Sequence, residues 1–269
     1  MPKKPYDWEK DPETYPFQHG SFLVDFESIS VIPRVSFKLI DRMWPEAKIP
    51  VITHSGGNLD RIIGGFTTLS VSTSTGGING SGSTSLLYVS PDGEIIDQSD
   101  NVSGIFLGNV VVGGSYRLRD AGPGVGVRFL AKLPTSNIKV NGWEQEGIDL
   151  SFQTTFSWNA GRVSGYHGLG IIYYGSDGTR ELALKKERFL MMNSLEYAWS
   201  DDFSLLAHLE TVSAAADYPE LDNPVVELTV GFKQRLGIGI LEFGIIENLF
   251  FFDNSSDIGV HAAYTFSLF

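Results

Sequence analysis

The chain has 269 residues, of which 42% are hydrophobic and 19% are charged, and its formal net charge is −12. It contains no cysteine, which excludes disulfide scaffolds, thiol chemistry and cysteine-ligated zinc or iron–sulfur sites. The acidic balance argues against a nucleic-acid partner, because phosphate neutralisation needs a clustered basic surface. The apolar runs are too short for a membrane-spanning helix.

The N-terminus lacks the pattern of a secretion signal. Lys3 and Lys4 supply positive charge, but acidic residues between Asp7 and Glu13 follow where a signal peptide has its apolar core. The chain is therefore either cytoplasmic or exported by a signal peptide that is absent from this sequence.

From Val110 to the C-terminus the sequence alternates between strand-like segments and turns. In residues 225–235 one face carries Val226, Leu228 and Val230, whereas the other face is mainly polar. This period of two indicates a sheet whose two faces meet different surroundings. The same alternation occurs in residues 127–133, 149–158 and 203–210.

The links between these strands alternate strictly in length. Short links occur near residues 120–124, 159–162, 200–202 and 237–239. Longer links occur near residues 135–147, 175–180, 213–223 and 253–257. In an up-and-down barrel alternate links lie at opposite ends, so this pattern is typical of bacterial outer-membrane barrels.

Aromatic residues gather near the expected strand ends, as they do in membrane girdles. They are Trp158, Tyr173, Trp199, Phe250, Phe251, Phe252, Tyr264 and Phe266. The terminal segment 258–269 is an amphipathic strand with a Tyr-x-Phe pattern. It is similar to the signal read by the barrel-assembly machinery, which we therefore expect as a partner.

The N-terminal part is less regular and predicts three further strands, at residues 22–26, 30–40 and 47–54. With those after Val110 the total is about twelve, an even number as closed bacterial barrels require. Residues 55–108 are expected to form one long loop insertion, with a short helix at 58–68 and a hairpin around Pro91-Asp92-Gly93.

The predicted fold is therefore all-β, a transmembrane antiparallel up-and-down β-barrel. Residues 21–269 form the single barrel domain, and residues 1–20 form a periplasmic or disordered segment. The alternative is a soluble sandwich or lipocalin-like barrel, whose strands also alternate but whose apolar side chains point inward. Periodicity alone does not give that direction. Long strands, aromatic strand ends and unequal links favour the membrane barrel.

Several stretches resemble a family of Gram-negative outer-membrane β-barrels known as domain of unknown function 3187. They are Trp44–Asp60, Arg61–Phe66, Tyr116–Arg119, Leu130–Pro134, Leu241–Asn248 and Asn254–His261. The resemblance implies a secreted, membrane-embedded barrel and hence a signal peptide. It implies no chemistry, since none is assigned to the family.

The most suggestive group for chemistry is His54, Ser55, Asp60 and Arg61, at the start of the long loop. One interpretation makes Ser55 a nucleophile, His54 its base and Asp60 the residue that orients the base, as in a membrane lipid hydrolase or deacylase. However, adjacent residues on an extended strand point to opposite faces, and Asp60 suits a plain helix cap. We therefore predict no catalytic residues and no enzyme activity.

Metal and cofactor sites are not predicted either. The five histidines show neither His-x-His nor His-x-x-x-His spacing. The glycine-rich segment 122–126 joins two strands, so it is a turn and not a phosphate-binding loop.

If the apolar faces meet lipid, charged residues of both signs line the interior. The lumen-lining candidates are Arg117, Arg119, Arg128, Lys132, Glu196, His208, Glu210, Glu227, Lys233, Arg235, Glu242 and His261. They suit either a salt-bridged plug that holds the barrel rigid or a polar pathway that selects a solute.

The predicted function is a passive channel or transporter for a small solute, located in the bacterial outer membrane. Its expected partners are outer-membrane lipid and lipopolysaccharide. The alternatives are the lipid hydrolase and a structural or adhesive barrel with a plugged lumen.

Overall fold

The protein is described by a computed structural model covering residues 22–25, 27–55, 85–89, 95–97, 104–119, 123–137, 147–176, 184–216, 221–250 and 258–267. These residues form strands and their connections, so the all-β prediction is confirmed. None of them belongs to a helix with the length and hydrophobicity needed to cross a membrane. The predicted N-terminal segment 1–20 and the predicted helix at 58–68 lie outside the described residues.

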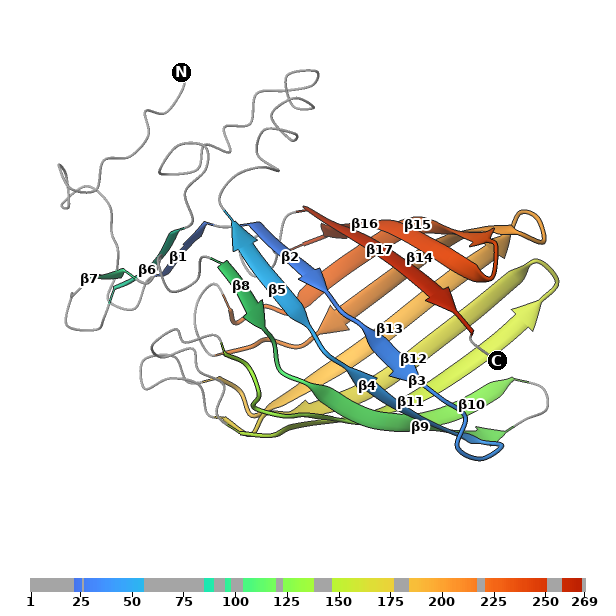
Figure 1. The fold of residues 1–269 in the computed structure, drawn as a ribbon, viewed down its shortest axis with the longest axis horizontal. Coiled ribbons are helices and arrows are strands. Elements are labelled where there is room, and N and C mark those ends of the chain that lie inside the picture. The colour runs from blue at the N-terminus through green and yellow to red at the C-terminus, as the bar shows by residue number, and fades with distance from the viewer. Residues whose placement is uncertain are drawn as a thin grey trace, which may run out of the picture.

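An antiparallel sheet of eleven strands dominates the structure, in the order β17-β16-β15-β14-β13-β12-β11-β10-β9-β4-β3. From β9 to β17 every strand pairs with its neighbours in sequence, as the up-and-down prediction requires. Figure 1 shows the sheet curving from β9 and β4, through β11–β13, to β15–β17 on the opposite side. The strands are β3 (Arg34–Ser36), β4 (Met43–Lys48), β9 (Val111–Arg119), β10 (Gly124–Lys132), β11 (Asp149–Ala160), β12 (Val163–Tyr173), β13 (Glu187–Ala198), β14 (Phe203–Val212), β15 (Val225–Leu236), β16 (Gly239–Asn248) and β17 (Ile258–Phe266).

A second sheet, β2-β5-β8, continues three strands of the first beyond interruptions. Its strands are β2 (Glu27–Val31), β5 (Val51–Ser55) and β8 (Gly104–Leu107). Pro33 and Pro50 lie at two of the interruptions, where proline has no N–H to donate to a ladder. The Pro33 carbonyl still accepts a hydrogen bond from Ile49 N (3.1 Å), and the Pro50 carbonyl accepts one from Gly108 N (2.8 Å). Neighbouring strands therefore remain hydrogen-bonded across these interruptions.

A third sheet, β1-β6-β7, contains the hairpin predicted around Pro91-Asp92-Gly93. Its strands are β1 (Phe22–Asp25), β6 (Ser85–Val89) and β7 (Ile95–Asp97). Strands β6 and β7 pair antiparallel, with Tyr88 opposite Ile96. Strand β8 falls inside the range 55–108 that we predicted as loop.

Closure of the sheet into a barrel of about twelve strands is not seen in the described residues. Its two edges are β3 and β17, and neither pairs with the other there. Because all ten neighbouring pairs in this order are antiparallel, the first and eleventh strands point the same way. Direct closure would therefore need a parallel pair, and antiparallel closure would need one more strand between them.

The direction of the two faces, which periodicity left open, is decided by side-chain exposure. Apolar residues of one face are exposed: 47% for Phe152, 63% for Leu169 and 66% for Phe189. Polar residues of the other face are buried, with Asp149 and Gln153 both at 7%. A soluble barrel has the reverse arrangement, because burying apolar side chains is what stabilises it in water. We call the polar face of the main sheet the inward face.

Polar atoms on the apolar face satisfy one another. The indole Nε1 of Trp158 donates to His167 Nε2 (2.9 Å), and His167 Nδ1 lies 2.9 Å from Asn193 Oδ1. Since indole nitrogen is a donor only, His167 accepts at Nε2 and carries its proton on Nδ1. The Trp158 ring covers Gly165, where a Cβ would overlap it. This series of hydrogen bonds satisfies the polar groups of Trp158, His167 and Asn193 on a face that water need not reach.

Gly113 on β9 allows β10 to approach closely. A Cβ there would overlap the Phe129 carbonyl oxygen and lie 2.9 Å from the Leu130 Cα. We predict that Gly113→Ala lowers the free energy of unfolding by about 1–3 kcal/mol, because the backbone of β10 must shift. Urea unfolding in detergent micelles, followed by tryptophan fluorescence, measures this change.

The matched control is Gly259→Ala in β17, whose Cβ would meet Ile246 at an ordinary 3.4 Å. Equal urea midpoints for the two variants would contradict the close-approach argument.

Candidate functional site

The inward face of the main sheet collects most of the predicted lumen-lining residues. The strand registers place there Arg117, Arg128, Lys132, Glu196, His208, Glu210, Glu227, Lys233, Arg235, Glu242 and His261. Arg119 departs from this set. A register shift puts it opposite Val125, whereas Arg117 lies opposite Gly126, so the bulge turns Arg119 away from the face of Arg117.

A line of polar side-chain contacts crosses five strands on one side of the sheet, with Lys233 between two glutamates. Lys233 Nζ on β15 lies 2.8 Å from Glu196 Oε2 on β13 and 3.7 Å from Glu242 Oε2 on β16. Ser204 Oγ on β14 donates to Glu196 Oε1 (2.7 Å), and His261 Nε2 on β17 lies 3.3 Å from Glu242 Oε1. These contacts join residues up to two strands apart, as expected where side chains converge on a concave surface.

The histidine and carboxylates farther along the same strands make a smaller group. Ser194 Oγ lies 2.6 Å from His208 Nδ1, and His208 Nε2 lies 3.6 Å from Glu210 Oε2. Glu210 is directly opposite Glu227 in the register of β14 and β15. Arg235 is at the far end of β15, where its Nε lies 3.3 Å from Asp202 Oδ1.

On the opposite side, a single carboxylate holds two arginines. Glu46 on β4 is 5% exposed. Its Oε2 lies 2.7 Å from Arg34 Nη2, and its Oε1 lies 2.5 Å from both Nε and Nη2 of Arg128. Arg128 reaches Glu46 across β9, where Gly113 is the register partner of Glu46 and has no side chain to intervene.

Lys132 forms a second pair beside this cluster. Its Nζ bonds Asp149 Oδ2 on the adjacent β11, and it lies 5.8 Å from the Tyr174 ring centroid. Asp149 Oδ1 also accepts a bond from the Gly175 backbone N–H (3.0 Å). The pair therefore joins β10 to the loop that follows β12.

Cations outnumber carboxylates at one side of the inward face, where Glu46 and Asp149 lie among five cations, and carboxylates outnumber cations at the other side, where Lys233 lies between two glutamates. We call Arg34, Lys48, Arg117, Arg128 and Lys132 the basic wall, and Glu196, Glu210, Glu227 and Glu242 the acidic wall. The basic wall is on β3, β4, β9 and β10, and the acidic wall is on β13–β16, of which Figure 1 shows β14–β16 across the curved sheet from β4 and β9. A solute between them would meet a field directed from one wall to the other.

Sequence reasoning missed Arg34, Trp44, Glu46 and Lys48 on the inward face. The predicted strands placed Trp44 and Glu46 in a link, whereas β4 runs from Met43 to Lys48 despite Pro45. The alternation of Trp44, Glu46 and Lys48 is the signal that would have found them, with Pro45 on the other face.

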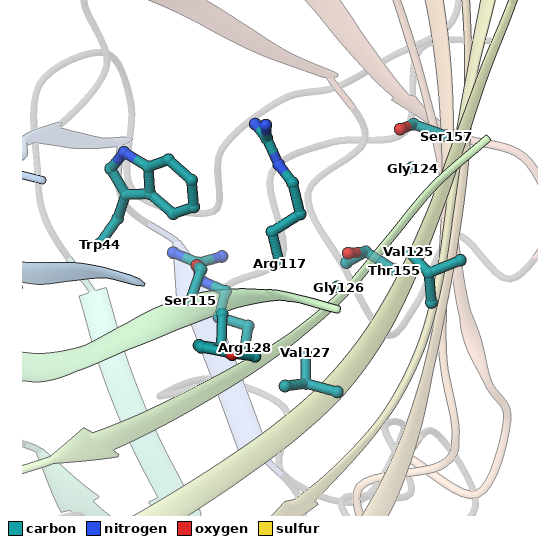
Figure 2. Close-up of a pocket in the computed structure, with 11 residues that line it drawn as sticks. Trp44, Ser115, Arg117, Gly124, Val125, Gly126, Val127, Arg128, Thr155 and Ser157 are labelled. Atoms are coloured by element: carbon teal, nitrogen blue, oxygen red, sulfur yellow. The ribbon is translucent and has the colours of Figure 1, made fainter. Parts of the chain in front are cut away.

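A pocket of about 220 Å³ opens beside the basic wall. Figure 2 shows Trp44 from β4 and Arg117 from β9 projecting into it. The Arg117 guanidinium lies 5.0 Å from the Trp44 ring centroid, within cation–π range. The pocket is lined by Trp44, Ser115, Tyr116, Arg117, Gly124, Val125, Gly126, Val127, Arg128, Thr155 and Ser157.

The turn between β3 and β4 carries an ion pair outside the strands. Lys38 Nζ lies 2.9 Å from Asp41 Oδ1, and the side chain of Asp41 is 94% exposed. The hydrogen bond and charge of Lys38 lower the pKa of Asp41. The pair is solvated, in contrast to the buried carboxylate of Glu46.

The loop candidates for hydrolysis are only partly described. His54 lies on β5 with its ring centroid 5.8 Å from that of Phe106. The Ser55 side chain and the residues Asp60 and Arg61 lie outside the described part of the chain. Among the residues that the structure describes, no three histidines or carboxylates gather in a way that could hold a metal ion.

The family model for a protein of unknown function, DUF3187, matches residues 12–268. The chain belongs to this family. The resemblance found in the sequence is thereby confirmed. A search of curated proteins finds no match.

Solved structures add a likeness of fold to this DUF3187 protein. A crystal structure described as the COG4313 outer membrane channel from Pseudomonas putida F1 is similar with a TM-score of 0.53 at 12% identity. The alignment covers 90% of this chain and 82% of that one. The CymD monoaromatic hydrocarbon channel matches at a TM-score of 0.38 and 11% identity, over 84% of this chain and 71% of that one. The first likeness shows the fold, and the second is too distant to support an inference.

We predict that Glu46→Gln in this DUF3187 protein lowers the free energy of unfolding by about 2 kcal/mol. The variant leaves two arginines close together without a carboxylate, and the loss stays below that of a fully buried pair because Arg34 is half exposed. Chemical unfolding in detergent micelles measures the change.

Asp41→Asn is the matched control, since it removes one carboxylate from an exposed pair and should alter stability by less than about 0.5 kcal/mol. If Glu46→Gln is as stable as this control, the Arg34–Glu46–Arg128 cluster does not hold β3, β4 and β10 together.

Proposed function

We propose that this protein is an outer-membrane channel through which a small polar solute passes, and that it is not an enzyme. The observation that carries the proposal is the reversed polarity of the main sheet. Large apolar side chains are exposed on one face and charged side chains are collected on the other. Exposed apolar area of this extent is stable in contact with lipid, and a charged interior is stable in contact with water.

The exposure of the inward charges supports a water-filled pathway over a packed plug. Lys233 and Glu242 keep 32% and 34% of their side-chain surface exposed although they lie within ion-pair distance of each other. A plug that holds a barrel rigid would bury such groups, because only complete pairing offsets the loss of their hydration.

The shared fold with an outer membrane channel and the aromatic side chains near strand ends agree with this location. Trp199 is 64% exposed, Tyr264 49% and Phe266 51%. Such side chains suit the boundary between lipid and water. Outer-membrane lipid, lipopolysaccharide and the barrel-assembly machinery would then be the partners of the folded chain.

We expect stepwise ion conductance when the folded protein is inserted into a planar lipid bilayer. Folding is checked beforehand by the shift in gel mobility on heating. The variant Glu210→Gln/Glu227→Gln, which removes two facing carboxylates from the acidic wall, should move the reversal potential in a KCl gradient toward the chloride value.

Silence from a sample that passes the folding check would overturn the channel proposal. Conductance with an unchanged reversal potential in the double variant would place the ion pathway away from the acidic wall. Lipid hydrolysis by the parent protein that is lost in His54→Ala would instead favour the enzyme alternative.

A further inference from the structure

We propose that the pocket between Trp44 and Arg117 is a binding site for a small organic carboxylate. Its part in transport rests on the proposed channel function, whereas binding itself rests on the pocket alone. Three features of the pocket support this proposal: a guanidinium without a carboxylate partner, an excess of positive charge around it, and a wall that offers both hydroxyls and an aromatic ring.

Arg117 differs from the neighbouring cations of the basic wall. Arg128 and Lys132 each contact a carboxylate, Glu46 and Asp149 respectively. Among the residues that the structure describes, no carboxylate lies within ion-pair distance of Arg117, and its guanidinium rests near the Trp44 ring at 5.0 Å. A fork of N–H donors held in place beside an aromatic ring is prepared for an incoming oxyanion.

The surroundings of Arg117 carry excess positive charge. Glu46 is shared between Arg34 and Arg128, so that cluster keeps one uncompensated positive charge. Lys48 follows on the same face of β4, where it is the register partner of Val111. The local field therefore attracts an anion toward Arg117 before any contact forms.

Glycines leave room for the ligand. Gly126 is the register partner of Arg117, and a Cβ on it would lie 3.0 Å from Thr155 Oγ1. A Cβ on Gly124 would lie 2.5 Å from Ser157 Oγ. The absent side chains keep Thr155 and Ser157 at the pocket wall, where their hydroxyls are available to a ligand.

Size and lining favour a carboxylate with a small apolar body over free phosphate. A pocket of about 220 Å³ is below the range of roughly 300–1,000 Å³ usual for drug-sized ligands. The planar guanidinium matches a carboxylate with two parallel bonds. The indole of Trp44 lines the same pocket, and an apolar body can cover this ring whereas phosphate leaves it exposed to water.

The backbone fixes the two main residues relative to each other. Trp44 lies opposite Ser115 in the register of β4 and β9, and Arg117 N donates to the Arg42 carbonyl (2.8 Å). Both residues therefore sit on paired strands and not on a loop. A site built on strands keeps its geometry without a ligand, which lowers the entropy lost on binding.

The test is a calorimetric titration of the folded protein in detergent micelles with benzoate, with its uncharged counterpart benzamide, and with inorganic phosphate. We expect benzoate to bind, benzamide not to bind measurably, and phosphate to bind more weakly than benzoate. Arg117→Gln should weaken benzoate binding about tenfold or more, because a charge-assisted hydrogen bond is lost.

Two further variants keep the result interpretable. Arg117→Lys retains the charge without the fork and should fall between the parent and Arg117→Gln. Arg162→Gln removes the same charge from an exposed turn after β11 and should bind benzoate as the parent does.

Each outcome decides the proposal. Equal benzoate affinity in the parent and Arg117→Gln, or equal loss in Arg162→Gln, would overturn the site, and tighter binding of phosphate would replace the carboxylate by a phosphate ligand. Because the titration does not depend on conductance, a protein that binds benzoate but is silent in a bilayer would refute the channel and leave the site standing. A conducting protein that does not bind benzoate would do the reverse.

Discussion

Pairing of charges across strands is the constraint on which the inward face depends. A charged side chain that leaves water must find an opposite charge or several hydrogen bonds, and most inward charges here find partners one or two strands away. Glu46 bonds arginines on both sides, and Lys233 lies between two glutamates. The contacts Glu46–Arg128 and Glu196–Lys233 join strands that are not adjacent, so they support the curvature that the backbone ladder alone does not impose.

The same constraint explains where the sheet tolerates absent side chains. Gly113 lets β10 approach β9 and lets Arg128 pass to Glu46, while Gly126 leaves space opposite Arg117. One glycine thus serves an ion pair and the other serves a pocket. On the apolar face Gly165 instead makes room for the ring of Trp158. The positions of the glycines and the pairing of charges in the interior therefore support each other.

The proposed channel function rests on the distribution of these charges. Glu46, shared by two arginines, leaves the basic wall positive, and the facing glutamates at positions 210 and 227 keep the acidic wall negative. A solute in the interior would be oriented by both walls. The carboxylate site at Arg117 would then hold an anion on the basic wall, at a point where the field and the free guanidinium act in the same direction.

Much of this architecture was determined by the sequence alone. Period-two alternation, strict alternation of link lengths and the hairpin around Pro91-Asp92-Gly93 were enough to predict antiparallel strands in sequential order from Val110 onward. These signals are local, because each depends on neighbouring residues and on the twofold repeat of a strand. The resemblance on Trp44–Asp60 and Leu241–Asn248 was likewise enough to find the family.

Only the tertiary structure decided which face is buried, because an alternating strand has the same pattern whether its polar residues face inward or outward. It also decided the pairing of Glu46 with Arg128, 82 residues apart, and the turn of Arg119 away from Arg117 at a bulge. Strand β4 was not predicted because it contains Pro45, but pairing with β9 holds β4 in the sheet. These features depend on contacts between distant segments, which no local pattern in the chain records.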